Sequence, residues 1–157
     1  MGQMAMLVSD RLDNHSILRH IAYQIGFLFQ SQDDVLDVFG DPKVTGKVGT
    51  DIQDGKCTWP SVRSVQKLHG TPELDDFKAG GPDIFEPSHY GEADPESVSR
   101  IKKLMHQLKL REEFANFEKR YSDKAGVKAD IDRLPERLST MRPVLHEAVD
   151  NLIDRKK

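Results

Sequence analysis

The chain has 157 residues, a formal net charge of -3, 37% hydrophobic and 31% charged residues. This length suits one ordinary domain with a modest core, and the charge excludes the basic excess that is typical of nucleic-acid-binding proteins. The single cysteine, Cys57, excludes a disulfide framework and favours a reducing compartment, so we expect a cytoplasmic protein.

Two helices are predicted at the start of the chain. Residues 2–8 form a short apolar helical segment, which lacks the positive start of a signal peptide and the length of a membrane span. Residues 14–38 form the longest predicted helix, because apolar side chains recur there at helical spacing. These side chains are Ile17, Leu18, Ile21, Ala22, Ile25, Leu28 and Phe29. Gly40, followed by Asp41 and Pro42, predicts the end of this helix.

The rest of the chain alternates between further helices and irregular segments. The expected order is a loop at 43–55, a helix at 57–68, an irregular stretch at 69–95 with a short helix at 74–78, and helices at 96–109 and 112–124. Pro135 and Pro143 bracket the last helices. Since no segment alternates as a strand does, the sequence predicts an all-α fold over residues 1–157, as part of one domain.

Four polar side chains share one face of the longest helix near its end: Gln30, Asp33, Asp34 and Asp37. Three carboxylates at these spacings repel one another and weaken a helix. Mg²⁺ offsets such repulsion, because it binds carboxylate oxygens together with waters and substrate phosphates. The alternative is a solvated acidic helix end, but the apolar residues 25–29 directly before the cluster favour a metal–phosphate site.

Two lysines follow in the glycine-containing loop. Lys47 and Lys56 both lie within twenty residues of the acidic cluster, where each amine can contact a phosphate that the metal holds. A solvated loop lysine is the alternative for each of them.

Three other kinds of site are excluded by spacing. A phosphate-binding P-loop needs four residues between its glycines and a Ser or Thr after its lysine, whereas five residues separate Gly40 from Gly46 and Val48 follows Lys47. The acidic cluster lacks the alternating positions and the distal glutamate of an EF-hand. The histidines and the cysteine show no zinc spacing.

A longer pattern surrounds the acidic cluster and the lysines. Residues 29–59 read Phe-Gln-x-Gln-Asp-Asp-x-Leu-Asp-x-Phe-Gly-Asp-Pro-x-Val-Thr-Gly-Lys-x-Gly-Thr-Asp-Ile-Gln-Asp-x-Lys-Cys-x-Trp. This segment closely resembles the farnesyl diphosphate synthase family of polyprenyl (isoprenoid) synthases. The resemblance is weaker over residues 89–118 and faint in the last forty residues.

The resemblance implies an all-α isoprenoid-synthase helical bundle, of which this chain is the C-terminal part. In such a bundle two aspartate-rich motifs face a deep cavity, and Mg²⁺ ions bridge them to an allylic diphosphate that isopentenyl diphosphate attacks head to tail. Asp33, Asp34 and Asp37 match the second motif and are the implied metal ligands, with Asp33 the direct one.

The same resemblance assigns the substrate-binding residues. Lys47 and Lys56 match the lysines that hold the allylic diphosphate, and Gln30 matches a glutamine that lines the same site. Lys47 and Asp33 are therefore the residues expected to act in catalysis. A homodimer is implied for the full-length protein. The basic residues 155–157 resemble a tail that closes over the ligand.

Two features that the family pattern requires are missing from the sequence. The chain contains no first aspartate-rich motif with its arginines, because Asp75 and Asp76 are not followed by a third carboxylate, and it contains no isopentenyl diphosphate-binding element. Two alternatives therefore stay open. One is a non-catalytic, diphosphate-binding or regulatory partner of a full-length synthase, and the other is a synthase of the same fold with another product length.

Overall fold

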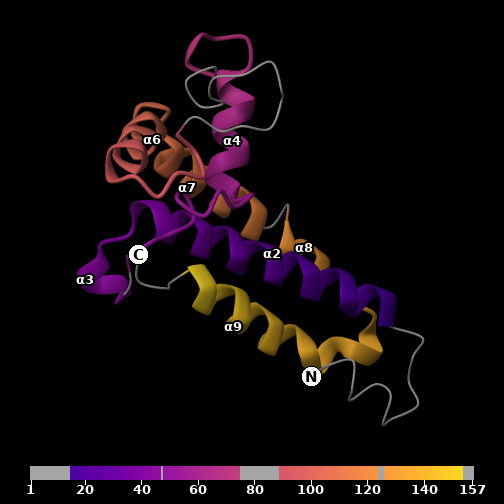
Figure 1. The fold of residues 1–157 in the computed structure, drawn as a ribbon. Coiled ribbons are helices and arrows are strands. Elements are labelled where there is room, and N and C mark those ends of the chain that lie inside the picture. Colours follow the sequence, from indigo (N-terminus) through magenta and orange to yellow (C-terminus); the bar gives the residue numbers. More distant parts are fainter. Residues whose placement is uncertain (1–14, 47, 75–88, 124–125, 154–157) are drawn as a thin grey trace. The chain divides into compact units, whose positions relative to one another are not determined.

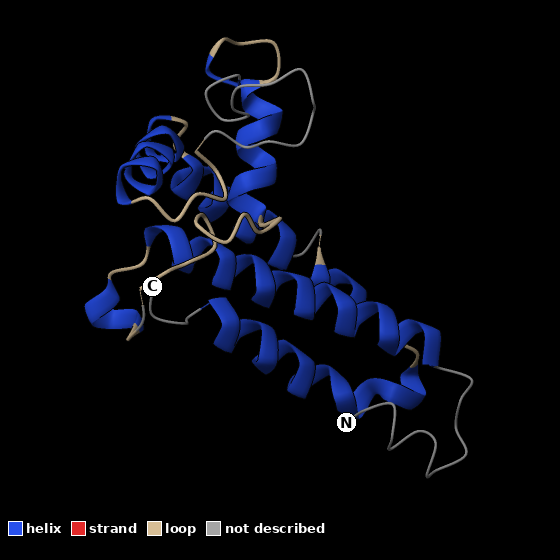
Figure 2. Ribbon diagram, in the orientation of Figure 1, coloured by secondary structure: helices blue, strands red, loops and turns tan. Residues whose placement is uncertain are grey.

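The computed structural model describes residues 15–46, 48–74, 89–123 and 126–153, and within these ranges every regular element is a helix (Figures 1 and 2). The predicted all-α class is confirmed. The described residues form two compact units. Residues 15–30 and 116–153 make up unit 1, and the described part of 31–115 makes up unit 2. In the described part of the chain no helix combines the length and the apolar character needed to cross a membrane.

Helix α2 (His15–Phe39) is the longest helix and contributes residues to both units. Its bounds confirm the helix predicted at 14–38. It ends where predicted, because the Gly40 N–H donates to the Leu36 carbonyl at 2.8 Å and closes the last turn. A Cβ at Gly40 would lie 2.4 Å from the Leu36 oxygen, so only glycine fits this position without a shift.

Unit 1 is built from the first part of α2 and the helices at the end of the chain. These are the last turns of α7 (Leu110–Ser122), α8 (Val127–Asp132), the 3-10 helix η2 (Glu136–Met141) and α9 (Arg142–Ile153). Its core consists of Ile21, Val127, Ile131, Leu134 and Val149. Figure 1 shows α9 alongside the first part of α2. Pro135 precedes η2, and Pro143 lies in the first turn of α9, as expected of residues that bracket helices.

Unit 2 contains the end of α2, α3 (Pro42–Thr45), α4 (Trp59–Leu68), α6 (Pro95–Gln107) and most of α7. Its buried core includes Val38, Ile52, Leu68, Tyr90, Ile101, Met105 and Leu110. The helices predicted at 57–68, 96–109 and 112–124 are therefore present with shifted ends.

The shifted ends follow from local capping. Helix α4 starts at Trp59 because Thr58 and Ser61 form a capping box. Helix α6 starts one residue early, because the Asp94 carboxylate accepts a hydrogen bond from the Ser97 N–H. Lys109 has φ 55°, and this left-handed backbone separates α6 from α7.

The prediction of a loop at 43–55 is wrong at its start, because residues 42–45 form helix α3. The Asp41 side chain accepts a hydrogen bond from the Lys43 N–H at 2.9 Å, and Pro42 occupies the first turn. The described rest of that loop, residues 46 and 48–55, contains no regular element, as predicted. The helix predicted at 2–8, residues 75–78 of the helix predicted at 74–78, and the basic residues 155–157 lie outside the described residues.

Candidate functional site

The three predicted metal ligands lie together at the end of α2, within unit 2. Asp33, Asp34 and Asp37 are each partly buried although they lie on the polar side of the helix. Their partial burial has a local cause. The loop that follows α3 returns to α2, where the loop bonds to Asp37 and the start of α4 bonds to Asp34.

Asp37 holds the middle of that loop. Its Oδ1 accepts a hydrogen bond from the Thr50 N–H at 3.3 Å, and its Oδ2 accepts one from the Asp51 N–H at 2.9 Å. The approach is so close that a Cβ at Gly49 would lie 1.9 Å from the Asp37 carbonyl oxygen. Glycine at position 49 is therefore required for the loop to reach the helix.

Asp34 holds the end of the loop, at the start of α4. Its Oδ2 accepts a hydrogen bond from the Trp59 N–H at 2.9 Å. A carboxylate is favourable there, because the first N–H groups of a helix lack backbone partners and carry partial positive charge. The Trp59 ring is fixed in turn by an edge-to-face contact with Phe114, with 5.0 Å between the ring centroids.

Lys56 belongs to the same network through its side chain. Its Nζ lies 2.7 Å from Asp51 Oδ1 and 3.4 Å from Asp54 Oδ2, and the side chain is 53% exposed. The hydrogen bond to Asp51 raises the pKa of Lys56 and so favours the charged form of the amine. Bonds thus lead from the Asp37 carboxylate through Asp51 to the Lys56 amine.

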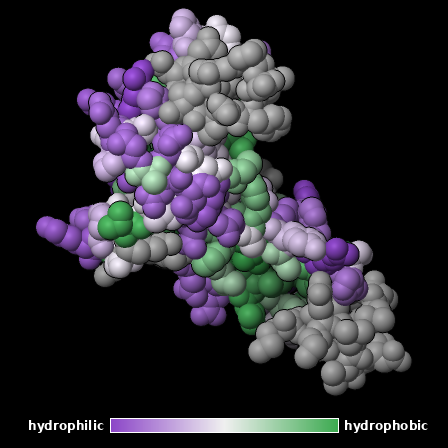
Figure 3. Space-filling model, in the orientation of Figure 1, coloured by the Kyte–Doolittle hydropathy of each residue, from purple (hydrophilic) through white to green (hydrophobic). Residues whose placement is uncertain are grey.

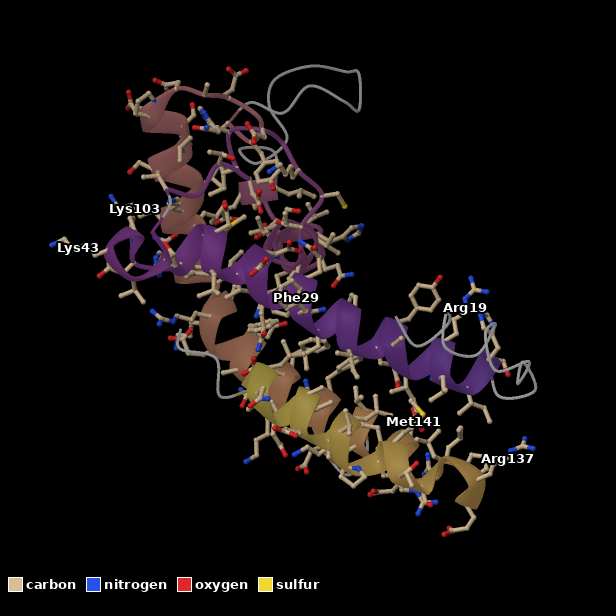
Figure 4. The ribbon with its side chains drawn as sticks, turned by 90° about the horizontal axis from the view of Figure 1, so that it is seen from below. Arg19, Phe29, Lys43, Lys103, Arg137 and Met141 are labelled. Atoms are coloured by element: carbon tan, nitrogen blue, oxygen red, sulfur yellow. The ribbon has the colours of Figure 1, made fainter. Side chains whose placement is uncertain are left out.

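The other predicted site residues are not brought into this network by the described contacts. Gln30 is exposed, one turn before the aspartates on α2, and Lys47 lies outside the described residues. Figure 4 shows Lys43 pointing away from α3. A cavity of about 390 Å³ in unit 1 is lined by none of the predicted residues. Its lining residues are Ser16, Ile17, His20, Ile21, Asp130 and Arg133.

The possible metal ligands at the end of α2 are all carboxylate oxygens, which is the type of ligand that a hard divalent cation prefers. Within the described residues, no three His, Cys, Asp or Glu side chains come close enough to form a complete metal site. Such a partial donor set suits Mg²⁺, which commonly takes one or two carboxylates and fills its other positions with waters and substrate phosphates.

Two contributors to this site were not predicted from the sequence. Tyr90 and Gly91 contact the loop that carries Lys56, although they lie more than thirty residues further along the chain. The signals in the sequence were the glycines at positions 55 and 91, which have positive φ in the structure, and the weaker family resemblance that begins at residue 89.

Comparisons with known proteins relate this chain to one family of enzymes. The Polyprenyl synthetase family matches residues 1–79. Farnesyl pyrophosphate synthase of Rattus norvegicus is 44% identical over 115 residues, which cover 73% of this chain and 30% of that protein. Farnesyl pyrophosphate synthase 1 of Cannabis sativa is 39% identical over 121 residues, covering 76% of this chain and 33% of that protein.

The similar solved structures belong to the same kind of enzyme. T. brucei farnesyl diphosphate synthase in complex with risedronate has a TM-score of 0.81 at 28% identity, covering 98% of this chain and 40% of that one. The same enzyme with bisphosphonate BPH-1326 has a TM-score of 0.79 at 30% identity, covering 98% of this chain and 49% of that one. The chain spans about a third of the length of the curated relatives it matches.

Proposed function

The chain belongs to the polyprenyl synthetase family, and from this premise we propose that it forms part of a Mg²⁺-dependent prenyltransferase. The proposed reaction is the head-to-tail condensation of an allylic diphosphate with isopentenyl diphosphate. One observation carries the proposal. The family match over residues 1–79 includes both the aspartates of α2 and the loop that carries Lys47 and Lys56. The farnesyl pyrophosphate synthases among the relatives support this class of substrate.

We propose Asp33 as the direct ligand of Mg²⁺, with Asp34 and Asp37 completing the acidic face. Asp34 and Asp37 have a second task, since their oxygens accept N–H groups from the loop. When bound, Mg²⁺ supplies positive charge that stabilises the departing diphosphate. The two positioning carboxylates keep the loop next to the metal-binding end of α2, so that its lysines reach the same phosphate oxygens.

Lys56, Lys47 and Gln30 are the proposed substrate-binding side chains. The Lys56 amine is held by two carboxylates in the structure, and a diphosphate offers it oxygens with more negative charge. We propose that the ligand takes over one of these bonds while the Asp51 bond keeps the amine in place. Gln30 adds an amide hydrogen bond from one helical turn before the aspartates.

Two properties of the whole protein belong to the same proposal. A homodimer is proposed from the family resemblance. A cytoplasmic location is proposed from the use of cysteine, because Cys57 is the only cysteine in the chain and its side chain is a free, exposed thiol.

The variant Asp33→Ala tests the proposed metal ligand. The 157-residue chain is titrated calorimetrically with inorganic diphosphate, with and without Mg²⁺. We expect saturable binding of the unmodified chain only with Mg²⁺, and loss of that binding in Asp33→Ala, because the protein anchor of the metal is gone. Asp123→Ala, which removes an exposed carboxylate next to the end of α7, is the control and should bind normally. Undiminished binding by Asp33→Ala contradicts the assignment.

A further inference from the structure

A turn that is distant in sequence packs against the loop that carries Lys56. The Tyr90 hydroxyl donates a hydrogen bond to the Lys56 carbonyl oxygen at 2.5 Å, and the Gly91 N–H donates to the Ile52 carbonyl oxygen at 2.8 Å. The two backbones nearly touch, because a Cβ on Gly55 would lie 3.3 Å from the Gly91 Cα. The turn therefore fixes the loop through two hydrogen bonds and one close backbone contact.

Tyr90 is rigidly placed for this task. Its side chain is only 8% exposed and belongs to the hydrophobic core of unit 2, together with Ile52. The preceding residue, His89, hydrogen-bonds through Nδ1 to the Ser97 hydroxyl at 2.9 Å. Burial raises the pKa of Tyr90 and so favours the protonated hydroxyl that donates this bond.

Lys56 is held through its carbonyl, its N–H and its side-chain amine. Its carbonyl accepts hydrogen bonds from the Tyr90 hydroxyl at 2.5 Å and the Ser61 hydroxyl at 3.3 Å. Its N–H donates to the Asp51 carbonyl at 3.0 Å, and its Nζ donates to Asp51 Oδ1 at 2.7 Å. Asp51 is itself bound to Asp37 on α2. The Tyr90 bond is the shorter of the two bonds to the Lys56 carbonyl, and Tyr90 is the more distant of the two donors along the chain.

The hydroxyl matters more than the ring for this role. A phenylalanine would fill the same core position with nearly the same volume, so a purely apolar site would not need the oxygen. A buried tyrosine hydroxyl requires a partner, and here it donates to the backbone carbonyl of a lysine with a substrate-binding assignment.

We propose that Tyr90 is a positioning residue, whose hydroxyl bond to the Lys56 carbonyl holds the Lys56 amine in place for a diphosphate-bearing ligand. The role of the amine rests on the proposed function, whereas the coupling between Tyr90 and the amine is a property of this chain alone. The two parts are therefore tested separately.

The coupling is tested by the reactivity of the amine. The variant Tyr90→Phe loses the hydroxyl, which loosens Lys56 and weakens its bond to Asp51. The pKa of Lys56 then falls towards its ordinary value, and a larger fraction of the amine is uncharged and reactive. We expect Lys56 to be acetylated at about pH 8 about twice as fast as in the unmodified chain, as read by mass spectrometry, because only the uncharged amine reacts.

Matched controls separate positioning from loss of stability. Asp51→Asn removes the partner of the amine directly and should accelerate Lys56 acetylation more than Tyr90→Phe does. Lys103, an exposed lysine on α6 (Figure 4), should react at an unchanged rate in every variant. Tyr121→Phe removes a hydroxyl in unit 1 and should leave the Lys56 rate unchanged. A rate in Tyr90→Phe equal to that of the unmodified chain, or an equal rise at Lys103, overturns the proposal.

A second measurement isolates the proposed function. Lys56→Met is titrated with inorganic diphosphate and Mg²⁺, alone and combined with Tyr90→Phe. If Tyr90 acts through the amine, Tyr90→Phe alone weakens the binding of diphosphate about fivefold, which is the equivalent of one net hydrogen bond. Added to Lys56→Met, the same substitution has no further effect. Equal weakening in both backgrounds overturns the positioning role. Normal binding by Lys56→Met removes Lys56 from the proposed function, and the acetylation rates still decide whether Tyr90 holds the amine.

Discussion

At the scale of single residues, the carboxylates on α2 differ in what they bind. Asp37 uses both oxygens for backbone N–H groups of the loop, and Asp34 uses one for the start of α4. The sequence predicted that Asp33, Asp34 and Asp37 share a face, because that follows from helical spacing alone. It could not predict these bonds, since their donors lie 13 to 25 residues further along the chain.

Lys47 is the proposed catalytic lysine, and its loss should weaken binding of diphosphate without removing the need for metal. We expect Lys47→Ala to lower the affinity for inorganic diphosphate, because one charge-assisted bond is lost while the carboxylates remain. The measurement is the same titration with Mg²⁺. Lys43→Ala is the matched control, since Lys43 lies on the exposed surface of α3 four residues earlier (Figure 4). An unchanged affinity in Lys47→Ala makes this lysine an ordinary loop residue.

Glu113 on α7 joins that helix to α4 and should make the stability depend on pH. Its carboxylate binds Arg63 and Lys67. Burial raises the pKa of Glu113, but the bonds from Lys67 and Arg63 outweigh burial and hold it below the usual 4.5. Because the pKa is lower in the folded state, these bonds stabilise the fold above about pH 4.5 and are lost as the pH falls through the lower, folded pKa.

The variant Glu113→Gln measures this contribution. At pH 7 it should lower the free energy of unfolding by roughly 1 kcal/mol in urea titrations, since the carboxylate is charged and partly buried. At about pH 3 the difference from the unmodified chain should shrink. Glu112→Gln, at the exposed neighbouring position, should show neither effect. A difference that is the same at both pH values would mean that the Glu113 charge does not stabilise the fold.

At the scale of elements, the loop depends on a glycine that no side chain can replace. Gly49→Ala places a Cβ 1.9 Å from the Asp37 carbonyl oxygen, so loop and helix must separate. We expect a loss of about 1–3 kcal/mol of stability, as is typical of overpacking, together with weaker binding of diphosphate. Gly26→Ala is the control. Gly26 lies inside α2 with nothing within 4 Å of an added Cβ, and alanine there should stabilise the helix by up to about 1 kcal/mol.

Thermal unfolding of both variants measures the difference. The melting temperature should fall for Gly49→Ala and rise for Gly26→Ala. If Gly49→Ala melts at the temperature of the unmodified chain, the loop does not dock on Asp37 as described.

The elements that sequence patterns predicted best are those with long apolar periodicity. Helix α2 was predicted within one residue at each end, because its apolar stripe repeats over many turns. Helix α3 was missed, because four residues have no periodicity. Asp41 and Pro42 were interpreted as the stop signal of α2, but the same residues also cap and start α3. The contact of Tyr90 with Lys56 joins positions that no local pattern connects.

At the scale of the whole molecule, large apolar side chains remain open to solvent. Tyr23 is 63% exposed and Phe27 is 49% exposed, both on the unit 1 part of α2. Apolar surface is visible on the face drawn in Figure 3. Such surfaces are typical of interfaces. The curated relatives are about three times as long as the stretch they share with this chain, so catalysis is best measured in a protein of their length.

The most direct test of the account is prenyl transfer by a chimera. In the farnesyl pyrophosphate synthase of Rattus norvegicus, the stretch that matches this chain is replaced by the corresponding residues of this chain. Product formation is measured from an allylic diphosphate and labelled isopentenyl diphosphate. The account predicts product only with Mg²⁺, loss of product with Asp33→Ala and retention with Asp123→Ala. A correctly folded chimera that forms no product under conditions where the rat enzyme does would contradict it.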